Sequence, residues 1–423
     1  MSDMSSMSRE RKKNQLRRQM ISSDKEKRQL RPEQEEDSDE VIRRAVKKVR
    51  RRRFVIFLVI LVIAAALGFG IYQYFIFHQY TTYTAIWEKP VAEGGAAQYE
   101  AFGGNVLKYT KDGASYINNE GKTVWMQSYE MKSPVVSVNG DYAVIADQQG
   151  NTMYICSKEG CQGTASTVLP IVKVTVAQNG VTAAILEDSR ASYIQYYKKD
   201  GTAMKVMVKS VLSGDGYPVD IGLSPDGTQL IVSFVYLTQG EMAQRVVIYD
   251  FSEIGKNENH VVGGFDDEFK GSLVAKVVYP NEEAACAFAD DSLTFFSTRN
   301  LADAAMIKQV AVKESIESVF YSDKYAGMIV QNTMGSAAYR LDVYQLTGDL
   351  AFSRELDYQY QDVRLSGDLV ILSDDTSCKI FNMHGVEKFS GDIDTGADII
   401  VAGKYPDTLI ITGQQTMKEI KLK

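Results

Sequence analysis

Histidine and cysteine, the side chains best suited to metal binding and nucleophilic chemistry, are scarce in this sequence, which has three of the first and four of the second. His78, His260 and His384 have no ligand spacing to one another or to a cysteine, so we expect no zinc site built from these residues. Triads of Ser, His and Asp assemble in space, but no serine lies in a nucleophile elbow. The sequence therefore nominates no catalytic, cofactor-binding or metal-binding residue.

The four cysteines occur in two kinds of setting. Cys156 and Cys161 flank the segment SKEG, which we interpret as a hairpin turn between two strands. Paired antiparallel strands bring Cα atoms to about 4.5–5.5 Å, which a disulfide can bridge. The pair is therefore a candidate disulfide, with two free thiols as the alternative. Cys286 and Cys378 stand in apolar, strand-like segments, and we predict that both are buried in the core.

Three acidic stretches resemble the start of a calcium-binding loop. The stretch DIDTGAD (392–398) has alternating Asp residues but no Glu at the later position that such a loop requires. The stretches GGFDDEF (263–269) and LSDDTS (372–377) carry less of the pattern. Because Asp in turns accepts hydrogen bonds from nearby backbone N–H groups, we favour turn capping over calcium and expect no cofactor.

A long apolar run determines where the rest of the chain lies. Residues 54–77 contain one clearly polar side chain, Gln73, and as a helix they would measure roughly 36 Å, enough to cross a hydrocarbon core of about 30 Å. Eight Lys and Arg residues lie in 43–53 and none in 79–87. The positive-inside rule predicts a single-pass anchor in the plasma membrane, with residues 1–53 cytoplasmic and the C-terminal domain extracytoplasmic.

Two alternatives to this anchor are weaker. A cleaved export signal has an apolar core of about 7–15 residues, whereas here 53 residues precede an apolar run of 24, and a buried helix would be less uniformly apolar. The tail, residues 1–53, has a net charge of +8, no aromatic residue and few aliphatic ones. We predict that it is disordered, with its basic end on the anionic lipid headgroups of the bilayer.

Strand-like segments in pairs fill the rest of the chain, residues 98–423, after a linker over 78–97. The first member of each pair is strongly apolar and the second alternates apolar and polar residues, a pattern typical of strands. First members occur at 105–110, 142–147, 181–186, 228–234, 283–290, 325–330, 368–373 and 407–412. Their mean spacing is about 43 residues, which is typical of four-stranded propeller blades. The sequence predicts an all-β ectodomain folded as a β-propeller.

The count of these pairs predicts eight blades. Seven blades is the runner-up, because residues 99–103 make a poor innermost strand for the first blade, and a pair of β-sandwiches comes third. The last blade lacks its outermost strand, and we expect residues 80–87 of the linker to supply it as a ring-closing strand. Closure would remove the exposed sheet edges that invite aggregation.

Two stretches resemble repeats of known propellers. LSPDGTQLIVSF (223–234) is similar to the inner hairpin of WD40 repeats, and SYINNEGKTVW (115–125) is similar to quinoprotein-type repeats, in which Trp125 would dock between blades. The whole layout resembles a domain-of-unknown-function family of membrane-anchored propeller proteins of Gram-positive anaerobic bacteria, and this resemblance implies no activity. A quinone cofactor would need several Trp-bearing blades, whereas Trp87 and Trp125 are the two tryptophans present.

The function predicted from this layout is a binding or scaffold module for a protein, a peptide or another cell-envelope ligand. The long segments 235–244 and 252–272 are expected to be loop insertions that build its binding face. The acidic exterior domain disfavours nucleic acid as a partner. A carboxylate-dependent enzyme in the propeller funnel, or a sensor that signals through the span into the tail, are the alternatives, and the sequence marks residues for neither.

Overall fold

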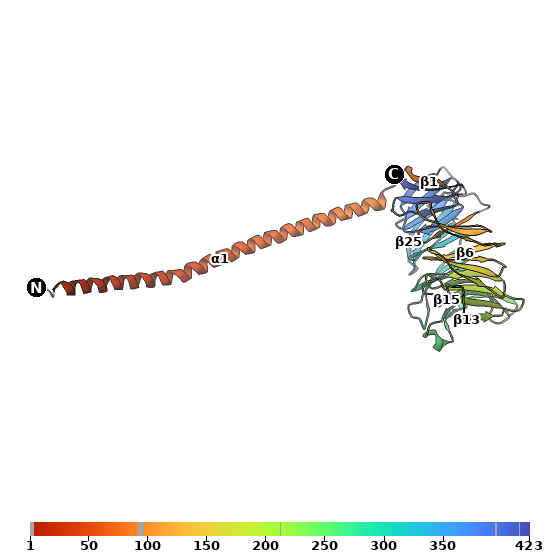
Figure 1. Ribbon diagram of the computed structural model, residues 1–423, viewed down its shortest axis with the longest axis horizontal. Coiled ribbons are helices and arrows are strands. Elements are labelled where there is room, and N and C mark those ends of the chain that lie inside the picture. The colour runs from red at the N-terminus through yellow and green to blue at the C-terminus, as the bar shows by residue number, and fades with distance from the viewer. Residues whose placement is uncertain (1–3, 92–96, 212, 394–395, 414) are drawn as a thin grey trace. The chain divides into compact units, whose positions relative to one another are not determined.

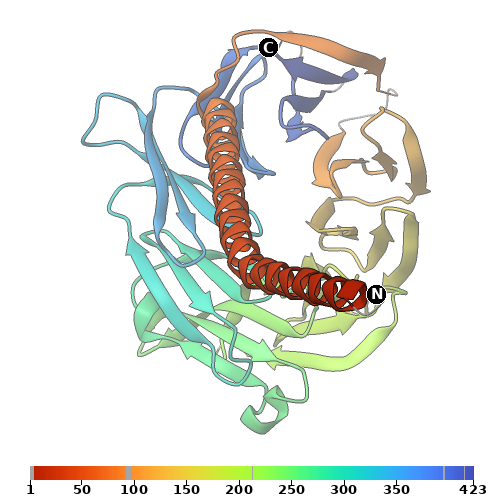
Figure 2. The same ribbon diagram turned by 90° about the vertical axis from the view of Figure 1, so that its left-hand side faces the viewer.

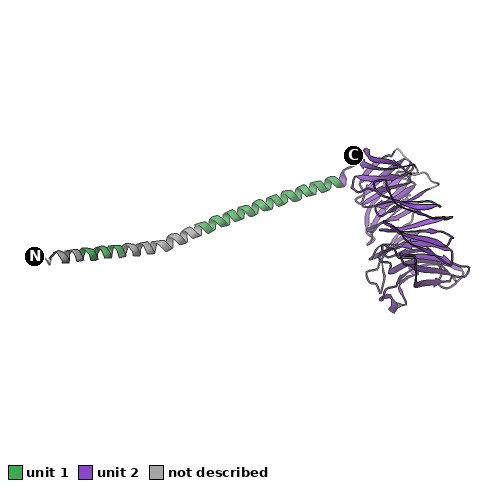
Figure 3. Ribbon diagram, viewed as in Figure 1, with its two compact units in different colours: residues 1–75 green, residues 76–423 purple. Residues whose placement is uncertain are grey.

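The protein is described by a computed structural model that divides into two compact units, residues 1–75 and residues 76–423 (Figure 3). The first unit is helical and the second consists almost entirely of β-strands (Figure 1). The structure describes residues 4–91, 97–211, 213–393, 396–413 and 415–423.

Helix α1, Met4–Phe77, contains a candidate membrane span. Its segment Ile42–Phe77 is long and apolar enough to cross a membrane, and the predicted run 54–77 lies within it. The side chains of residues 42–72 are exposed. Apolar side chains in such numbers are unfavourable in water, and a lipid environment would accommodate them together with the fully paired helical backbone.

The same helix also covers the tail for which the sequence predicts disorder. Lys, Arg, Gln and Glu are frequent in residues 4–53, and these residues have high intrinsic helix propensity. An isolated helix, however, gains nothing from tertiary packing and is marginal in water. Disorder of the tail in solution therefore stays a prediction, which circular dichroism of the corresponding peptide would test.

The second unit is a ring of eight four-stranded antiparallel sheets, or blades (Figure 2). The innermost strands are β2 (Gln98–Phe102), β6 (Pro134–Asn139), β10 (Ile171–Val176), β14 (Tyr217–Leu223), β18 (Val274–Asn281), β22 (Ile316–Tyr321), β26 (Asp362–Ser366) and β30 (Ile399–Ala402). The second strands are β3 (Asn105–Tyr109), β7 (Tyr142–Asp147), β11 (Thr182–Glu187), β15 (Gln229–Thr238), β19 (Ala284–Ala289), β23 (Tyr325–Gln331), β27 (Leu369–Ser373) and β31 (Thr408–Thr412).

The outer half of each blade follows in the same order. The third strands are β4 (Gly113–Ile117), β8 (Thr152–Ser157), β12 (Ser192–Tyr197), β16 (Glu241–Asp250), β20 (Ser292–Ser297), β24 (Tyr339–Gln345), β28 (Ser377–Asn382) and β32 (Thr416–Leu422). The outermost strands are β5 (Thr123–Ser128), β9 (Gly160–Ser166), β13 (Ala203–Ser210), β17 (Val261–Phe265), β21 (Ala305–Ala311), β25 (Leu350–Leu356), β29 (Glu387–Asp392) and β1 (Tyr83–Pro90). The prediction of an eight-bladed propeller is confirmed, and β2 is the innermost strand that the seven-blade alternative lacked.

The ring closes through strand β1, which comes first in the sequence but completes the last blade. It pairs antiparallel with β32, from Tyr83 opposite Leu422 to Pro90 opposite Thr416. The Trp87 indole N–H donates to a Glu419 carboxylate oxygen at 2.9 Å. The expectation that the linker supplies the missing strand is therefore confirmed, with the strand at 83–90.

The second strands carry most of the core. Strands β19 and β31 are buried along their whole length, because the neighbouring blades cover both faces of each sheet. Between the fifth and sixth blades, for example, Cys286, Phe295 and Met328 pack in one cluster. Coverage on both faces explains why these segments are almost continuously apolar in sequence. The prediction that Cys286 and Cys378 are buried is confirmed.

The segment 235–244 is not a loop insertion, contrary to the sequence analysis. Strands β15 and β16 continue through it with unbroken pairing from Val235–Gln244 to Thr238–Glu241. The strands turn at Gln239 and Gly240, whose φ angles are 53° and 85°. Two consecutive residues with positive φ are typical of the two-residue hairpin turn whose twist matches that of the strands. The blade is therefore lengthened by a rigid hairpin.

The segment 252–272 is likewise not a plain loop. It contains β17, the outermost strand of the fourth blade, and two short 3-10 helices, η1 (Gly255–Glu258) and η2 (Asp267–Phe269). The buried Phe269 packs in the core cluster shared by the fourth and fifth blades. The few apolar residues of β17 lie next to Gly and Asp residues in the sequence. This composition is typical of loops and favoured that interpretation.

Candidate functional site

A ring of this kind has two faces, which we name by the connections on them. The turn face carries the turns from first to second and from third to fourth strands, such as 322–324 and 403–407. The crossover face carries the turns from second to third strands and the connections between blades, such as 167–170, 239–240 and 332–338. The two faces offer different candidate sites.

The central channel of the ring forms a cavity. Its volume is about 840 Å³, and residues of all eight innermost strands line it. Its lining also includes Gly103, Gly140, Ser322 and Gly367, which lie in the turns that follow innermost strands. The cavity therefore opens on the turn face.

An ion pair forms part of the channel wall between the third and fourth blades. The Lys173 ammonium lies 2.5 Å from a carboxylate oxygen of Asp220, whose side chain is 3% exposed. The other carboxylate oxygen accepts a hydrogen bond from the backbone N–H of Val277, on β18, at 2.8 Å. Asp220 thus joins three neighbouring blades, and both of its oxygens have partners.

A second ion network lies across the channel, between the seventh and first blades. The Arg364 guanidinium contacts the Asp362 carboxylate at 2.7 Å and the Glu100 carboxylate at 3.5 Å. One cation therefore serves two carboxylates here. The contact to Glu100 is long for a hydrogen bond, and Glu100 also lines the cavity.

Lys276 and Tyr321 form a third polar group on the channel wall. The Lys276 ammonium lies 5.1 Å from the centre of the Tyr321 ring, a cation–π contact. Burial lowers the pKa of Lys276, and the charge of Asp220 opposes that lowering. Burial, followed by the charges of Asp220 and Glu100, raises the pKa of Tyr321 to about 12. Tyr321 therefore keeps its hydroxyl proton at neutral pH and can donate it in a hydrogen bond.

The crossover face presents large apolar side chains to solvent. Val168 is 95% exposed, Met334 90% and Met242 71%. Val211, Leu237 and Leu273 on the same face are also exposed. Single exposed apolar residues are ordinary, whereas a contiguous apolar patch is typical of a surface that binds another protein. Methionine in particular is enriched in such interfaces.

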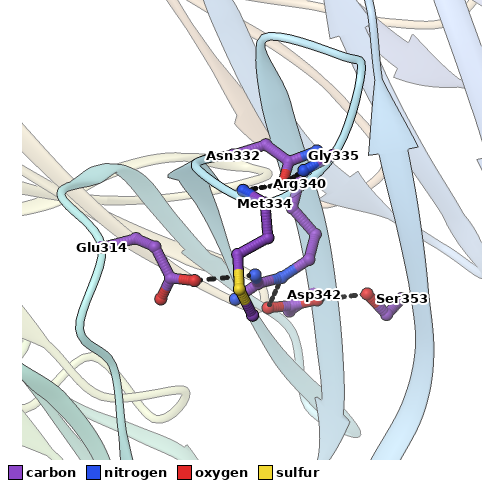
Figure 4. Close-up of polar contacts among 7 residues, drawn as sticks. All are labelled: Glu314, Asn332, Met334, Gly335, Arg340, Asp342 and Ser353. Atoms are coloured by element: carbon purple, nitrogen blue, oxygen red, sulfur yellow. Dashed lines mark hydrogen bonds and ion pairs between the residues drawn. The ribbon is translucent and has the colours of Figure 1, made fainter.

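The loop that carries Met334 is held by a polar network (Figure 4). The Asn332 side-chain oxygen accepts hydrogen bonds from the backbone N–H groups of Met334 and Gly335, at 3.4 and 3.0 Å. Below it, Arg340 bridges Glu314 at 3.0 Å and Asp342 at 2.9 Å. Asp342 also accepts a hydrogen bond from Ser353 at 2.6 Å. The exposed methionine is thus presented by a fixed loop.

The cysteines, histidine and tryptophan described next lie apart from both candidate sites, whereas the predicted binding segment 235–244 carries Leu237 and Met242 on the crossover face. Cys156 and Cys161 are a cross-strand pair on β8 and β9, and the structure joins their sulfur atoms in a disulfide. The His260 Nδ1–H donates to the backbone oxygen of Asp250 at 2.8 Å. Trp125 docks against the second blade, as predicted, because its indole N–H donates to the Ser157 backbone oxygen at 3.1 Å.

The acidic stretches have mainly local partners where the structure describes them. Asp374 accepts hydrogen bonds from the backbone N–H groups of Thr376 and Ser377, which caps the turn between β27 and β28. The stretch 263–269 forms the end of β17 and helix η2. The stretch 392–398 includes residues 394–395, which lie outside the described residues. Among the described residues, no group of three His, Cys, Asp or Glu side chains is placed to hold a metal ion.

Sequence reasoning missed the charged residues of the channel, although a signal for them exists. Lys173, Asp220 and Lys276 each stand alone inside an apolar innermost strand, in the stretches IVKVTV, PVDIGL and VAKVVY. Each follows a bulge in the pairing of its strand. A charged residue recurring at one position of otherwise apolar repeats would have indicated a channel-facing position.

Comparison with solved structures shows the same fold. BamB from Moraxella catarrhalis is 11% identical, with a TM-score of 0.50, over 81% of this chain and 100% of that chain. Sqt1 from Chaetomium thermophilum is 10% identical, with a TM-score of 0.52, over 82% and 97%. Sqt1 from the same organism bound to the N-terminus of ribosomal protein L10 is 11% identical, with a TM-score of 0.50, over 77% and 92%. Identities this low establish the architecture and nothing more.

Comparison with sequence families identifies the propeller. A search of curated proteins finds no match. One family model matches residues 76–422, which cover the whole propeller, and its description is a family of unknown function. The resemblance noted from the sequence is therefore confirmed, and the chain belongs to the DUF5711 family.

Proposed function

We propose that this protein is a membrane-anchored binding module whose propeller lies outside the cell and binds another protein through the crossover face. The observation that carries the proposal is the group of exposed apolar side chains on that face, led by Val168, Met242 and Met334. The fixed loop and the rigid hairpin that present them lower the entropy lost on binding. The partner is expected to be a protein of the cell envelope, because the anchor would keep the propeller there.

Two further observations support this proposal. The candidate span and the basic residues before it favour an orientation with the propeller outside. Among the propellers of similar fold, Sqt1 is described in complex with the N-terminus of ribosomal protein L10, so a ring of this architecture can hold a segment of another protein. An enzyme in the channel has less support, because Glu100 and Asp220 are both engaged in ion pairs.

The test is crosslinking in whole cells, followed by affinity purification and mass spectrometry. The full chain would be compared with the double variant Met242→Glu/Met334→Glu, and with Met126→Glu as a matched control. Met126 is 77% exposed but lies on the outermost strand β5, away from the crossover face. A charge placed in an apolar interface costs binding.

A protein that the full chain and the control both enrich, but that the double variant enriches at least about tenfold less, would support the proposal. Equal enrichment by all three chains would move the binding surface elsewhere and overturn the assignment of the crossover face. If no protein is enriched over a chain truncated after Trp87, the proposal of a protein-binding module is wrong.

A further inference from the structure

Lys276 and Tyr321 place hydrogen-bond donors in the channel that the protein itself does not use. Both line the cavity. Within the described part of the chain, Lys276 has its cation–π contact with Tyr321 and no carboxylate within ion-pairing distance, and the Tyr321 hydroxyl has no hydrogen-bond partner. An ammonium has three N–H donors and a phenol one O–H donor. Lys276 is half-buried and Tyr321 is 39% exposed, so solvent or a ligand in the cavity can accept hydrogen bonds from both groups.

None of the other charged residues that line the described cavity forms an ion pair with this ammonium. Asp220, the carboxylate whose charge acts most on Lys276, is already paired with Lys173 and with the Val277 backbone N–H. On the opposite side, Glu100 and Asp362 share one cation, Arg364. In the described part of the channel wall, Lys276 is therefore a cation without an ion-pair partner beside the fifth and sixth blades, where Asp323 of the adjoining turn also lines the cavity. The opposite wall, beside the seventh and first blades, has an excess of negative charge.

Glu100, Lys276 and Tyr321 all line this one cavity. A ligand that contacts Lys276 and Tyr321 on one side and Glu100 on the other needs a carboxylate and a cation a short distance apart in the same molecule. The cavity of about 840 Å³ is within the range of small-ligand sites. A dianion such as phosphate would be repelled by the carboxylates of Glu100 and Asp220, whereas a monoanion that carries its own cation would not.

We propose that the central channel binds a small zwitterion, an amino acid or a short peptide with free termini, whose carboxylate is held by Lys276 and Tyr321 and whose ammonium lies toward Glu100. This site is separate from the crossover face and does not depend on the proposed protein binding. The ligand enters from the turn face, where the cavity opens. A charge-assisted hydrogen bond from Lys276 supplies most of the affinity.

The test uses the full chain in detergent and four probes: trialanine, trialanine amide, N-acetyl-trialanine and inorganic phosphate. Binding is measured by calorimetry, and protection of Lys276 from acetic anhydride is measured by mass spectrometry. Lys276→Met removes the ammonium and keeps the apolar stem. Lys404→Met is the matched control, because Lys404 also stacks on a tyrosine, Tyr405, at 5.8 Å but is exposed on the turn face.

The expected result is that trialanine binds the full chain and the Lys404→Met chain and protects Lys276. Its dissociation constant rises about ten- to hundredfold in Lys276→Met. Trialanine amide fails to protect Lys276, and the N-acetyl peptide binds more weakly than trialanine. The proposal is overturned if trialanine does not bind, if it binds Lys276→Met as tightly as the full chain, or if phosphate protects Lys276 equally well.

Discussion

Asp220 is the single residue on which the channel wall depends most at the scale of side chains. Its carboxylate is almost fully buried and holds both Lys173 and the Val277 N–H. Its substitution by alanine leaves one backbone donor and one ammonium without their acceptor, which costs more than the pair itself contributes. Because Lys173 is partly exposed, solvent compensates some of that cost.

We therefore expect Asp220→Ala to lower the free energy of unfolding by about 1–3 kcal/mol in denaturant titrations of the full chain. The control is Asp141→Ala, which removes the exposed ion pair of Asp141 with Lys158 at 2.6 Å. An exposed pair contributes about 0–1 kcal/mol, so the control should change little. Equal effects of the two substitutions would show that the burial of Asp220 does not increase the free energy lost when its carboxylate is removed.

The cysteines give a second test at this scale. Cys156 and Cys161 are joined in the structure, whereas Cys286 and Cys378 are buried thiols. Burial raises the pKa of both thiols, that of Cys378 to about 12, which suppresses the reactive thiolate. We predict that iodoacetamide labels none of the four in the native protein, two after denaturation and all four after denaturation with reduction. Four labelled cysteines without reductant would contradict the bridge.

Single side chains also show where sequence reasoning reaches its limit. The burial of Cys286 and Cys378 followed from their apolar neighbours, and the docking of Trp125 followed from a resemblance to known repeats. The channel charges were not predicted, because Lys173 and Lys276 look like isolated exceptions until the ring brings their strands together. Which residues face one another across a propeller depends on the closure of the ring, and local periodicity carries no information about it.

At the scale of elements, the strands were predictable and their lengths were not. Apolar segments such as 142–147 and 368–373 identified strands directly, because blade-to-blade packing buries both of their faces. The hairpin at 235–244 was mistaken for a loop because most of its polar residues are exposed to solvent, as polar residues in loops are. A two-residue turn at Gln239 and Gly240 was the local signal for it.

The closing strand β1 permits a prediction about the stability of the whole ring. Trp87 bonds to Glu419 in the last blade, and its ring packs on Gly121 of the first blade, where an added Cβ would lie 2.9 Å from it. Trp87 therefore ties the two ends of the ring. We expect Trp87→Ala to lower the free energy of unfolding by about 2–4 kcal/mol, because a large partly buried aromatic contact is lost.

Ile86 offers the matched control for this strand. It is an exposed neighbour in β1, so Ile86→Ala should change the free energy of unfolding by less than about 0.5 kcal/mol. Guanidinium titrations of both variants and of the unchanged chain would measure these free energies of unfolding. A loss from Ile86→Ala as large as that from Trp87→Ala would mean that general weakening of the strand, and not the tryptophan contact, determines closure.

At the scale of the whole molecule, charge is distributed unequally along the chain. Residues 1–53 carry a net charge of +8, which leaves −15 for the remainder of a chain whose total is −7. An apolar helix separates the two parts. The positive-inside rule counts the Lys and Arg residues close to the span, and eight of them in 43–53 against none in 79–87 favour an exported propeller.

The orientation can be tested because the native cysteines are bridged or buried. We predict that a membrane-impermeant maleimide labels Met126→Cys in intact cells, since Met126 is 77% exposed on the propeller and lies away from the crossover face, and that it labels Ser6→Cys in the tail only after permeabilisation. The chain without either substitution should stay unlabelled, which controls for the native thiols. The reverse pattern would place the propeller in the cytoplasm. In that case the basic residues 43–53 would lie outside the cell, against the positive-inside rule, and the proposed envelope partner would have to be replaced by a cytoplasmic one.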